Sequence, residues 1–345
     1  MDGSSGTGNG TTTNRAPETS ASPNPLRWRL GNPNRSVDSA NLAREWFQSD
    51  IVLTLGPNAP DAVAGDPAVA DRIRGALGRT LMESASGEAI SGRPCPWSPP
   101  CALDILWGET GQVRRGVPIP KPFLIRVDAP RPGWLEIRLS LFGFATDWAE
   151  GIGDALVRTF RNGVSLEGGP HRRPFDPCHR LVETPNPAPC PPPFARSDDV
   201  ADVSLWFITP VIPRRGNRTA LDPLALLTGL SRRAEGMARW HDAALEVQGQ
   251  ALGEAARALR VDPFGLRPIA WTRPHTRNRS HDIPRSGFTG PYRLFGPSWA
   301  LAEIQPLLTL GQAQGAGGHV ALGLGQYRLI GPKGPSNSET SVDFR

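Results

Sequence analysis

The sequence predicts an α+β protein built from two similar halves, and three observations support this. The chain has 345 residues, which is enough for about two domains with hydrophobic cores. It contains 38 glycines and 37 prolines, which indicates many turns and short elements. The second half shows the order strand–helix–strand–strand–helix–strand of the ferredoxin-like (RRM-like) motif, and the first half shows an incomplete version. We therefore expect two tandem ferredoxin-like domains with a C-terminal glycine-rich loop.

The elements of the first half follow from alternation and helical periodicity. We expect strands at residues 26–30 and 51–55, a helix at 66–84, strands at 121–130 and 133–143, and a helix at 145–160. The first helix has an Asp-Pro start signal, and its apolar residues then recur every four positions. A Pro/Gly turn separates the third and fourth strands.

The second half repeats this order more completely. We expect a strand at residues 202–212, a helical stretch at 222–252, a hairpin from 267–281 and 287–296, a helix at 298–312, and a last strand at 319–330. Ser298 is a plausible N-cap of the last helix, because its hydroxyl can accept a bond from the first turn.

Composition predicts the domain boundaries. We expect a disordered segment at 1–25, a first domain at 26–169, a proline-rich linker at 170–199, a second domain at 200–332 and a flexible tail at 333–345. The linker is predicted to have no regular structure because proline is so dense in it.

The charge of the chain permits binding of nucleic acid. The net charge is +5, and lysine occurs only at Lys121 and Lys333, so nearly all positive charge is arginine. Arginine binds phosphates bidentately and stacks on bases, although a bias of codon composition explains such a preference equally well. No stretch resembles a membrane span or a signal sequence, so we expect a cytoplasmic protein with no membrane partner.

The four cysteines do not predict a metal site. Cys95 and Cys101 stand six positions apart, and Cys178 and Cys190 follow far along the chain, without the short spacing of common zinc sites. We expect free thiols, no metal and no cofactor.

Several motifs together indicate a family. They are "IRGALGRTL" followed by "RPCPWSPPCALDILWGE", then "LSLFGFATDWAEGIGDAL", then "SRRAEGMARWHD" after "WFITPVI", and finally "GFTGPYRLFG" followed by "LLTLGQAQGAGGHVALGLGQYRL". In this order and spacing the chain resembles the CRISPR-associated precursor-RNA processing endoribonucleases of the RAMP superfamily.

The resemblance implies that the chain recognises a CRISPR repeat RNA, as a stem-loop or a single strand, and cuts it without a metal ion. The 2′-hydroxyl would attack the adjacent phosphate and leave a 2′,3′-cyclic phosphate. The product would stay bound with other CRISPR effector subunits as partners. The alternatives are a repeat-binding subunit without activity and a backbone subunit of the effector.

Histidine is the residue type that best transfers protons near neutral pH. The resemblance implies a catalytic histidine in the first domain, but the earliest histidine is His171, outside the predicted boundaries of that domain. The candidates are therefore His319, His281 and His241, with His319 in the glycine-rich loop as the first choice.

Candidate RNA contacts cluster in the hairpin of the second half. The segment "WTRPHTRNRSHDIPR" predicts contacts from Arg273, His275, Arg277, Arg279 and Arg285. Further candidates are Arg74 in the first helix and Gly317 and Gly318 in the loop, where backbone N–H groups of glycine can approach phosphates closely.

Overall fold

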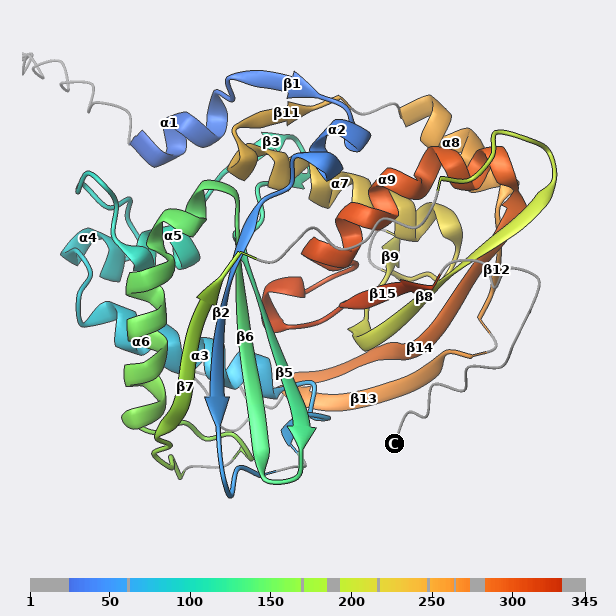
Figure 1. The fold of residues 1–345 in the computed structure, drawn as a ribbon. Coiled ribbons are helices and arrows are strands. Elements are labelled where there is room, and N and C mark those ends of the chain that lie inside the picture. The colour runs from blue at the N-terminus through green and yellow to red at the C-terminus, as the bar shows by residue number, and fades with distance from the viewer. Residues whose placement is uncertain are drawn as a thin grey trace, which may run out of the picture.

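A computed structural model describes residues 25–60, 63–168, 171–184, 193–215, 218–246, 249–263, 265–273 and 283–330. The first domain consists of β2 (Gln48–Leu55), α3 (Val69–Met82), β5 (Phe123–Arg131), β6 (Trp134–Phe142), α6 (Ala149–Arg161) and β7 (Pro177–Glu183). Its sheet has the order β5-β6-β2-β7, and both neighbours of β2 are antiparallel to it. The helices α3 and α6 cover the outer face of this sheet (Figure 1). This is the complete ferredoxin-like topology.

Strand β7 contradicts the prediction that residues 170–199 lack regular structure. It pairs with β2 from Asp50 opposite Glu183 to Leu55 opposite Pro177. The strand lies at the edge of the sheet, and an edge strand tolerates a proline at its first residue because one row of its N–H groups needs no partner. His179 lies on β7, so the structure places a histidine in the first domain, on the edge opposite to β5.

The second domain repeats the topology. It consists of β8 (Val200–Val211), α7 (Pro223–Ala238), β12 (Arg260–Asp262), β13 (Arg267–Arg273), β14 (Ile283–Pro297), α9 (Ser298–Gln314) and β15 (Tyr327–Ile330). The sheet order is β12-β14-β8-β15, with β13 also paired to β14. The helices α7 and α9 cover one face of it (Figure 1). The predicted fold class is confirmed for both halves.

Three details of the second half differ from expectation. The stretch 222–252 is not one helix, because α7 is followed by a 3-10 turn η3 (Arg239–His241), β11 (Ala243–Leu245) and α8 (Gly249–Ala258). The last strand begins only at β15, because Val320–Leu322 forms a 3-10 turn, η4, between His319 and Gly323, which both lie in the left-handed region. Ser298 is the first residue of α9 rather than its cap, and its hydroxyl donates to the Ala195 carbonyl at 2.6 Å.

The N-terminal part of the described chain is helical where a strand was expected. Residues 26–30 belong to α1 (Pro25–Gly31), whose buried residues Leu26 and Leu30 stand four positions apart on one face. The chain continues through β1 (Arg35–Val37) and α2 (Ser39–Arg44). In this path β1 pairs in parallel with β11 of the second domain (Figure 1).

Connecting elements complete the described fold. They are α4 (Gly87–Ile90), α5 (Ala102–Trp107), β3 (Gln112–Arg114), β4 (Val117–Pro118), the 3-10 turn η2 (Gly143–Trp148), β9 (Arg214–Arg215) and β10 (Arg218–Thr219). None of the helices in the described ranges has the length and apolar character needed to cross a membrane. The predictions for residues 1–24 and 333–345 lie outside the described residues.

The hydrophobic core of the first domain extends into the second domain, which also has a core of its own. Buried residues of α7 and α9 join the cluster that fills the first domain. The Trp240 indole donates to the Pro120 carbonyl at 2.9 Å, and Gln326 Nε2 donates to the Ile125 carbonyl at 3.1 Å. Arg114 forms a bidentate ion pair with the buried Glu235 at 2.7 and 2.8 Å. These contacts therefore fix the position of one domain against the other.

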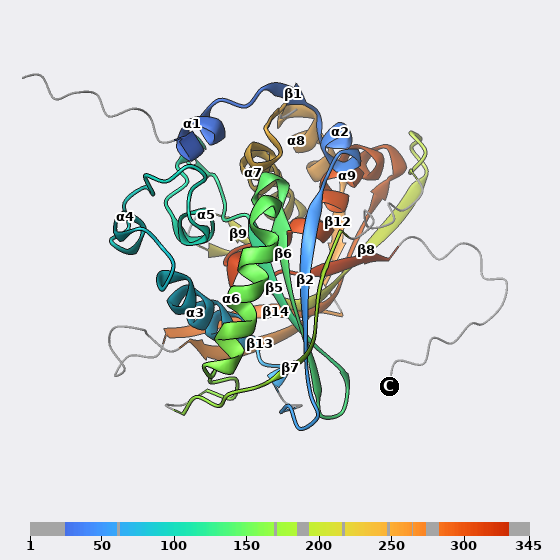
Figure 2. The ribbon, with the colours of Figure 1, turned by 60° about the vertical axis from the view of Figure 1, so that its left-hand side comes forward.

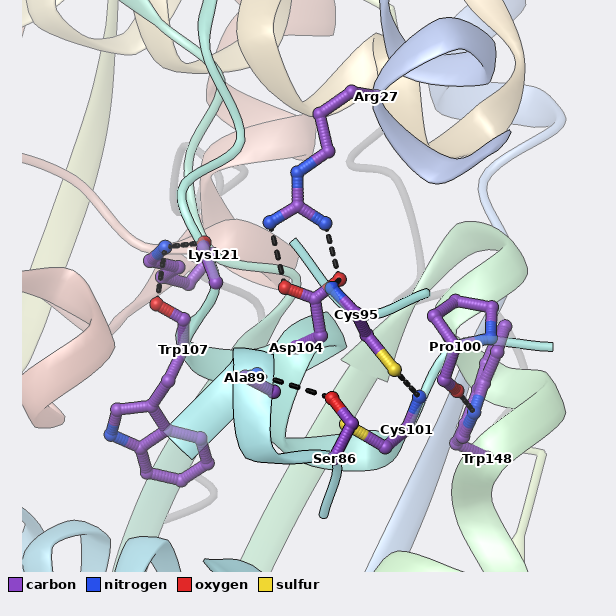
Figure 3. Close-up of polar contacts among 11 residues, drawn as sticks. Arg27, Ser86, Ala89, Cys95, Pro100, Cys101, Asp104, Trp107, Lys121 and Trp148 are labelled. Carbon is purple, nitrogen blue, oxygen red and sulfur yellow. Dashed lines mark hydrogen bonds and ion pairs between the residues drawn. The ribbon is translucent and has the colours of Figure 1, made fainter. Parts of the chain in front are cut away.

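A buried polar cluster ties α1 to the first domain (Figure 3). The Asp104 side chain is 1% exposed and accepts bonds from both terminal nitrogens of Arg27 and from the Cys95 N–H. Lys121 lies nearby, where its Nζ donates to the carbonyls of Trp107 and Gly108 and so satisfies the end of α5. Burial, together with repulsion from Arg27 and Arg74, lowers the pKa of Lys121 from 10.5 to about 8.

This lowered pKa predicts a pH dependence of stability. Between about pH 8 and 10.5 the unfolded chain holds a proton on Lys121 that the folded protein has released, so the free energy of unfolding rises with pH. We expect urea unfolding between pH 8 and 10 to show this rise in the parent protein and a flatter profile in Lys121→Met. Parallel profiles would show that Lys121 titrates normally.

Candidate nucleic-acid interface

A groove runs between the two domains through three adjoining hollows. The widest lies between the first sheet and α9, and it shares Arg126, Ile208 and Gln326 with the second hollow. The second continues along the start of α3 and shares Pro67 with the third. The groove therefore joins the inner edge of the first sheet to the foot of the β13–β14 hairpin.

The third hollow brings together residues that are distant in the sequence. Its lining residues are Pro67, Ala68, Asp71, Trp271, Arg285, His319, Leu322 and Leu324. Two of the predicted site residues, His319 and Arg285, thus line one hollow. Its volume is about 10 Å³, which is room for one water, so an RNA would meet these side chains at its rim. Asp71 and Trp271 were not predicted, although Trp271 stands in the basic hairpin segment, where an aromatic residue among arginines was the available signal.

Backbone geometry holds His319 in this place. His319 has a φ of 61°, in the left-handed region, and directly precedes η4. On both sides the chain turns at glycines with positive φ, among them Gly317 and Gly325. The Ala316 N–H donates to the Gly325 carbonyl at 2.8 Å, which closes the loop, and the Gly325 N–H donates to the Pro210 carbonyl at 2.9 Å.

The same contacts contradict a phosphate-binding role for the N–H group of Gly318. That group donates to the Ile212 carbonyl at 3.0 Å, so it is already satisfied by the end of β8. A Cβ at Gly317 would lie 2.9 Å from the same carbonyl oxygen. Close approach is needed at these glycines, but the approaching group is protein backbone.

The foot of the basic hairpin borders the cavity. In the β13–β14 register Trp271 lies opposite Arg285, and Arg273 lies opposite Ile283. Arg285 is half-buried, and one end of β13 lies near α3 (Figure 2). His275, Arg277, Arg279 and His281 lie outside the described residues, as does the side chain of Arg273. An RNA held by this hairpin would reach the cavity with His319.

The widest part of the groove carries ion pairs rather than free positive charge. Arg138 bonds to Asp50 at 3.0 Å, to Glu136 at 2.9 Å and to Glu183 at 2.5 Å. Burial disfavours its charge, but these hydrogen bonds prevail and raise the pKa of Arg138. Arg126 pairs with Asp128 at 2.9 Å. These arginines stabilise the sheet. At the other end of the groove, Arg285 shares its hollow with Asp71.

The structure contradicts a catalytic role for His241. Its side chain is buried between Trp46 and Phe47, with ring centroids 4.3 and 4.8 Å away. Burial, with a smaller effect of Arg35, lowers the pKa of His241 to about 3. A histidine that is neutral and inaccessible at pH 7 can neither reach an RNA nor act there as an acid. It is a core residue at the contact between the domains.

The structure also contradicts the prediction that Arg74 contacts RNA. Its side chain is 20% exposed, lies 4.0 Å from Asp71 and packs over the Trp107 ring at 5.2 Å. Helix α3 buries its apolar face in the first domain, and Trp107 on α5 covers this arginine. The guanidinium therefore belongs to the packing of α3 against α5.

The chain is similar to known proteins in part of its sequence and in its structure. Residues 205–327 match the family model of the CRISPR-associated endoribonuclease Cas6, which confirms the resemblance predicted from the motifs. One Cas6 product complex is 16% identical (TM-score 0.46) and covers 83% of this chain and 99% of its own. A second Cas6 product complex is 20% identical (TM-score 0.45), and the match covers 82% of this chain and 99% of that chain. Thermus thermophilus Cas6 is 15% identical (TM-score 0.43), and the match covers 83% of this chain and 99% of that chain. A search of curated proteins found no match.

Proposed function

We propose that this protein, whose second domain matches the Cas6 endoribonuclease family, binds CRISPR repeat RNA and cuts it into guide RNAs without a metal ion. The observation that carries the proposal is the cavity at the foot of the basic hairpin. There a histidine, an arginine and a tryptophan from three separate segments line one hollow between the domains. These residue types transfer protons, bind phosphates and stack on bases.

The chemistry assigned to the cavity is an intramolecular phosphoryl transfer. The 2′-oxygen forms a bond to phosphorus as its proton is removed, and the bond from phosphorus to the 5′-oxygen breaks as that oxygen gains a proton. The products are a 2′,3′-cyclic phosphate and a 5′-hydroxyl. His319 takes part in proton transfer, and Arg285 stabilises the negative charge that builds up on the phosphate oxygens.

A repeat-binding subunit without activity is the second candidate. Among the described lining residues of the cavity, His319 is the one histidine, whereas the reaction needs both a proton acceptor and a proton donor. His281 on the hairpin is the candidate for the second group. In either case we propose that the protein acts in the cytoplasm and keeps the RNA bound within a larger CRISPR effector complex.

The test is to incubate the protein with end-labelled repeat RNA in EDTA. We expect a single cut with a cyclic phosphate end. Binding without a cut would favour the second candidate, and neither binding nor cutting would overturn the proposal.

Arg285 provides a sharper version of this test. We expect Arg285→Ala to weaken binding of repeat RNA by roughly tenfold and to reduce the slope of log K against log salt by about one, because one phosphate contact is lost. Arg161→Ala is the matched control, since Arg161 is exposed on α6 and pairs with Asp176. Equal loss in both variants would show that the effect is one of net charge.

A further inference from the structure

The open face of the second sheet carries an exposed tryptophan at its centre. Side chains at alternate positions of β8 share one face, and Phe207 is buried beneath the helices while Trp206 is 48% exposed on the opposite face. Val200 and Ile208 on β8 and Ile330 on β15 are exposed apolar residues of the same face. Exposed apolar residues that gather on one sheet face indicate a candidate binding site.

The register of the sheet surrounds this tryptophan with groups suited to RNA. Arg328 on β15 lies directly opposite Trp206, and Pro291 on β14 lies opposite it on the other side. Adjacent strands are about 4.8 Å apart. A base stacked on the Trp206 indole would therefore leave its own phosphate within reach of the Arg328 guanidinium.

A second aromatic residue lies further along the same face. Phe295 on β14 is opposite Asp202 on β8 and Arg260 on β12. It is four residues from Pro291, which is about 14 Å along the strand. A shallow hollow at this end of the sheet is lined by Val200, Asp202, Asp262, Arg293 and Phe295. The face thus has two aromatic positions separated by the length of a few nucleotides.

The charges on this face favour RNA as the occupant. Three arginines, Arg260, Arg293 and Arg328, share it with two aspartates, and Arg293 bonds to Asp202 at 2.9 Å. Arg328, beside the tryptophan, is exposed. The centre of a protein–protein interface is depleted of charged residues. An aromatic ring with an arginine beside it instead fits a stacked base and its phosphate.

We infer that this face, centred on Trp206, Arg328 and Phe295, binds an unpaired segment of the RNA by stacking its bases. The inference rests on the proposed function and adds to it a second RNA-binding surface, which meets the groove at Ile208 and lies beyond the hollow with His319. We expect this surface to bind RNA of any sequence, because every base has a ring face that can stack.

The test is the affinity for an unstructured pyrimidine RNA of about 12 nucleotides, measured by fluorescence anisotropy. We expect Trp206→Ala to weaken binding about tenfold and Trp206→Phe to remain within about threefold of the parent. Trp97→Ala is the matched control, because Trp97 is also 48% exposed but lies in the loop before α5. With 5-iodouridine in the RNA, the cross-link should map to the peptide with Trp206.

Each other outcome has a definite meaning. If Trp206→Ala binds this RNA as tightly as the parent does, the inference is overturned. It is also overturned if the parent does not bind this RNA but still cuts a repeat stem-loop, and in that case the proposed function stands. If the parent is a dimer in sedimentation and Trp206→Ala is a monomer with unchanged RNA affinity, the face is a protein interface.

Discussion

Replacing His319 should slow the cutting of repeat RNA by about 10²- to 10⁴-fold, because a positioned proton donor or acceptor contributes this much. His319 has a φ of 61°, and asparagine tolerates this conformation better than alanine does. His319→Asn therefore removes the proton transfer and keeps the turn, whereas His319→Ala also strains it. Both variants should bind the repeat within a few-fold of the parent in the same assay.

His171→Ala is the matched control for this prediction, because His171 is exposed in the segment between α6 and β7. It should cut at the parental rate. If His319→Asn cut as fast as the parent, the loop would hold the fold without taking part in the reaction. If binding and cutting fell together, His319 would be an RNA contact rather than a proton-transfer group.

Replacing Gly325 by alanine should destabilise the protein by about 3 kcal/mol and slow cutting strongly. Gly325 has a φ of 71°, and a Cβ there would lie 1.8 Å from the Ala316 carbonyl oxygen. The substitution thus adds backbone strain to a collision that the loop can relieve only by opening. An open loop displaces His319 from the cavity, so urea unfolding and single-turnover cutting should both change.

Gly229→Ala is the control for the loop, because Gly229 lies inside α7 with no atom within 4 Å of the added Cβ. It should be neutral or stabilising by up to about 1 kcal/mol. If Gly325→Ala does not fold, Gly317→Ala is a milder variant, since its Cβ would meet Ile212 O at 2.9 Å. Parental stability and activity in both loop variants would contradict the described geometry.

Most elements of the fold could be predicted from the sequence because the spacing of their apolar residues fits only one type of secondary structure. The four-residue recurrence in α3 and the alternation in the first part of β6 each bury one face of the element. The strand predicted at residues 26–30 was wrong, because so short a segment fits the periodicity of a helix and that of a strand equally well. The burial of Leu26 and Leu30 on one side favours the helix.

Strand β7, the fourth strand of the first domain, could not be predicted from its local sequence for a different reason. Its prolines and charged residues argue against a strand when the segment is considered alone. Pairing with β2 provides the hydrogen bonds that favour the strand, and its edge position removes the penalty for proline. A contact between residues more than a hundred positions apart decided this element, and a local pattern does not contain it.

The sequence alone determined the fold class, the family resemblance and the choice of His319 and the arginine-rich hairpin, because residue type and local spacing express these properties. Only the tertiary structure decided which candidates share a site. It placed Arg285 and His319 in the lining of one hollow, used the N–H of Gly318 within the fold and buried His241. It also left Trp206 exposed on a sheet face. The physical reason is that burial and proximity depend on how the two domains pack, and the sequence encodes that packing only through contacts distant along the chain.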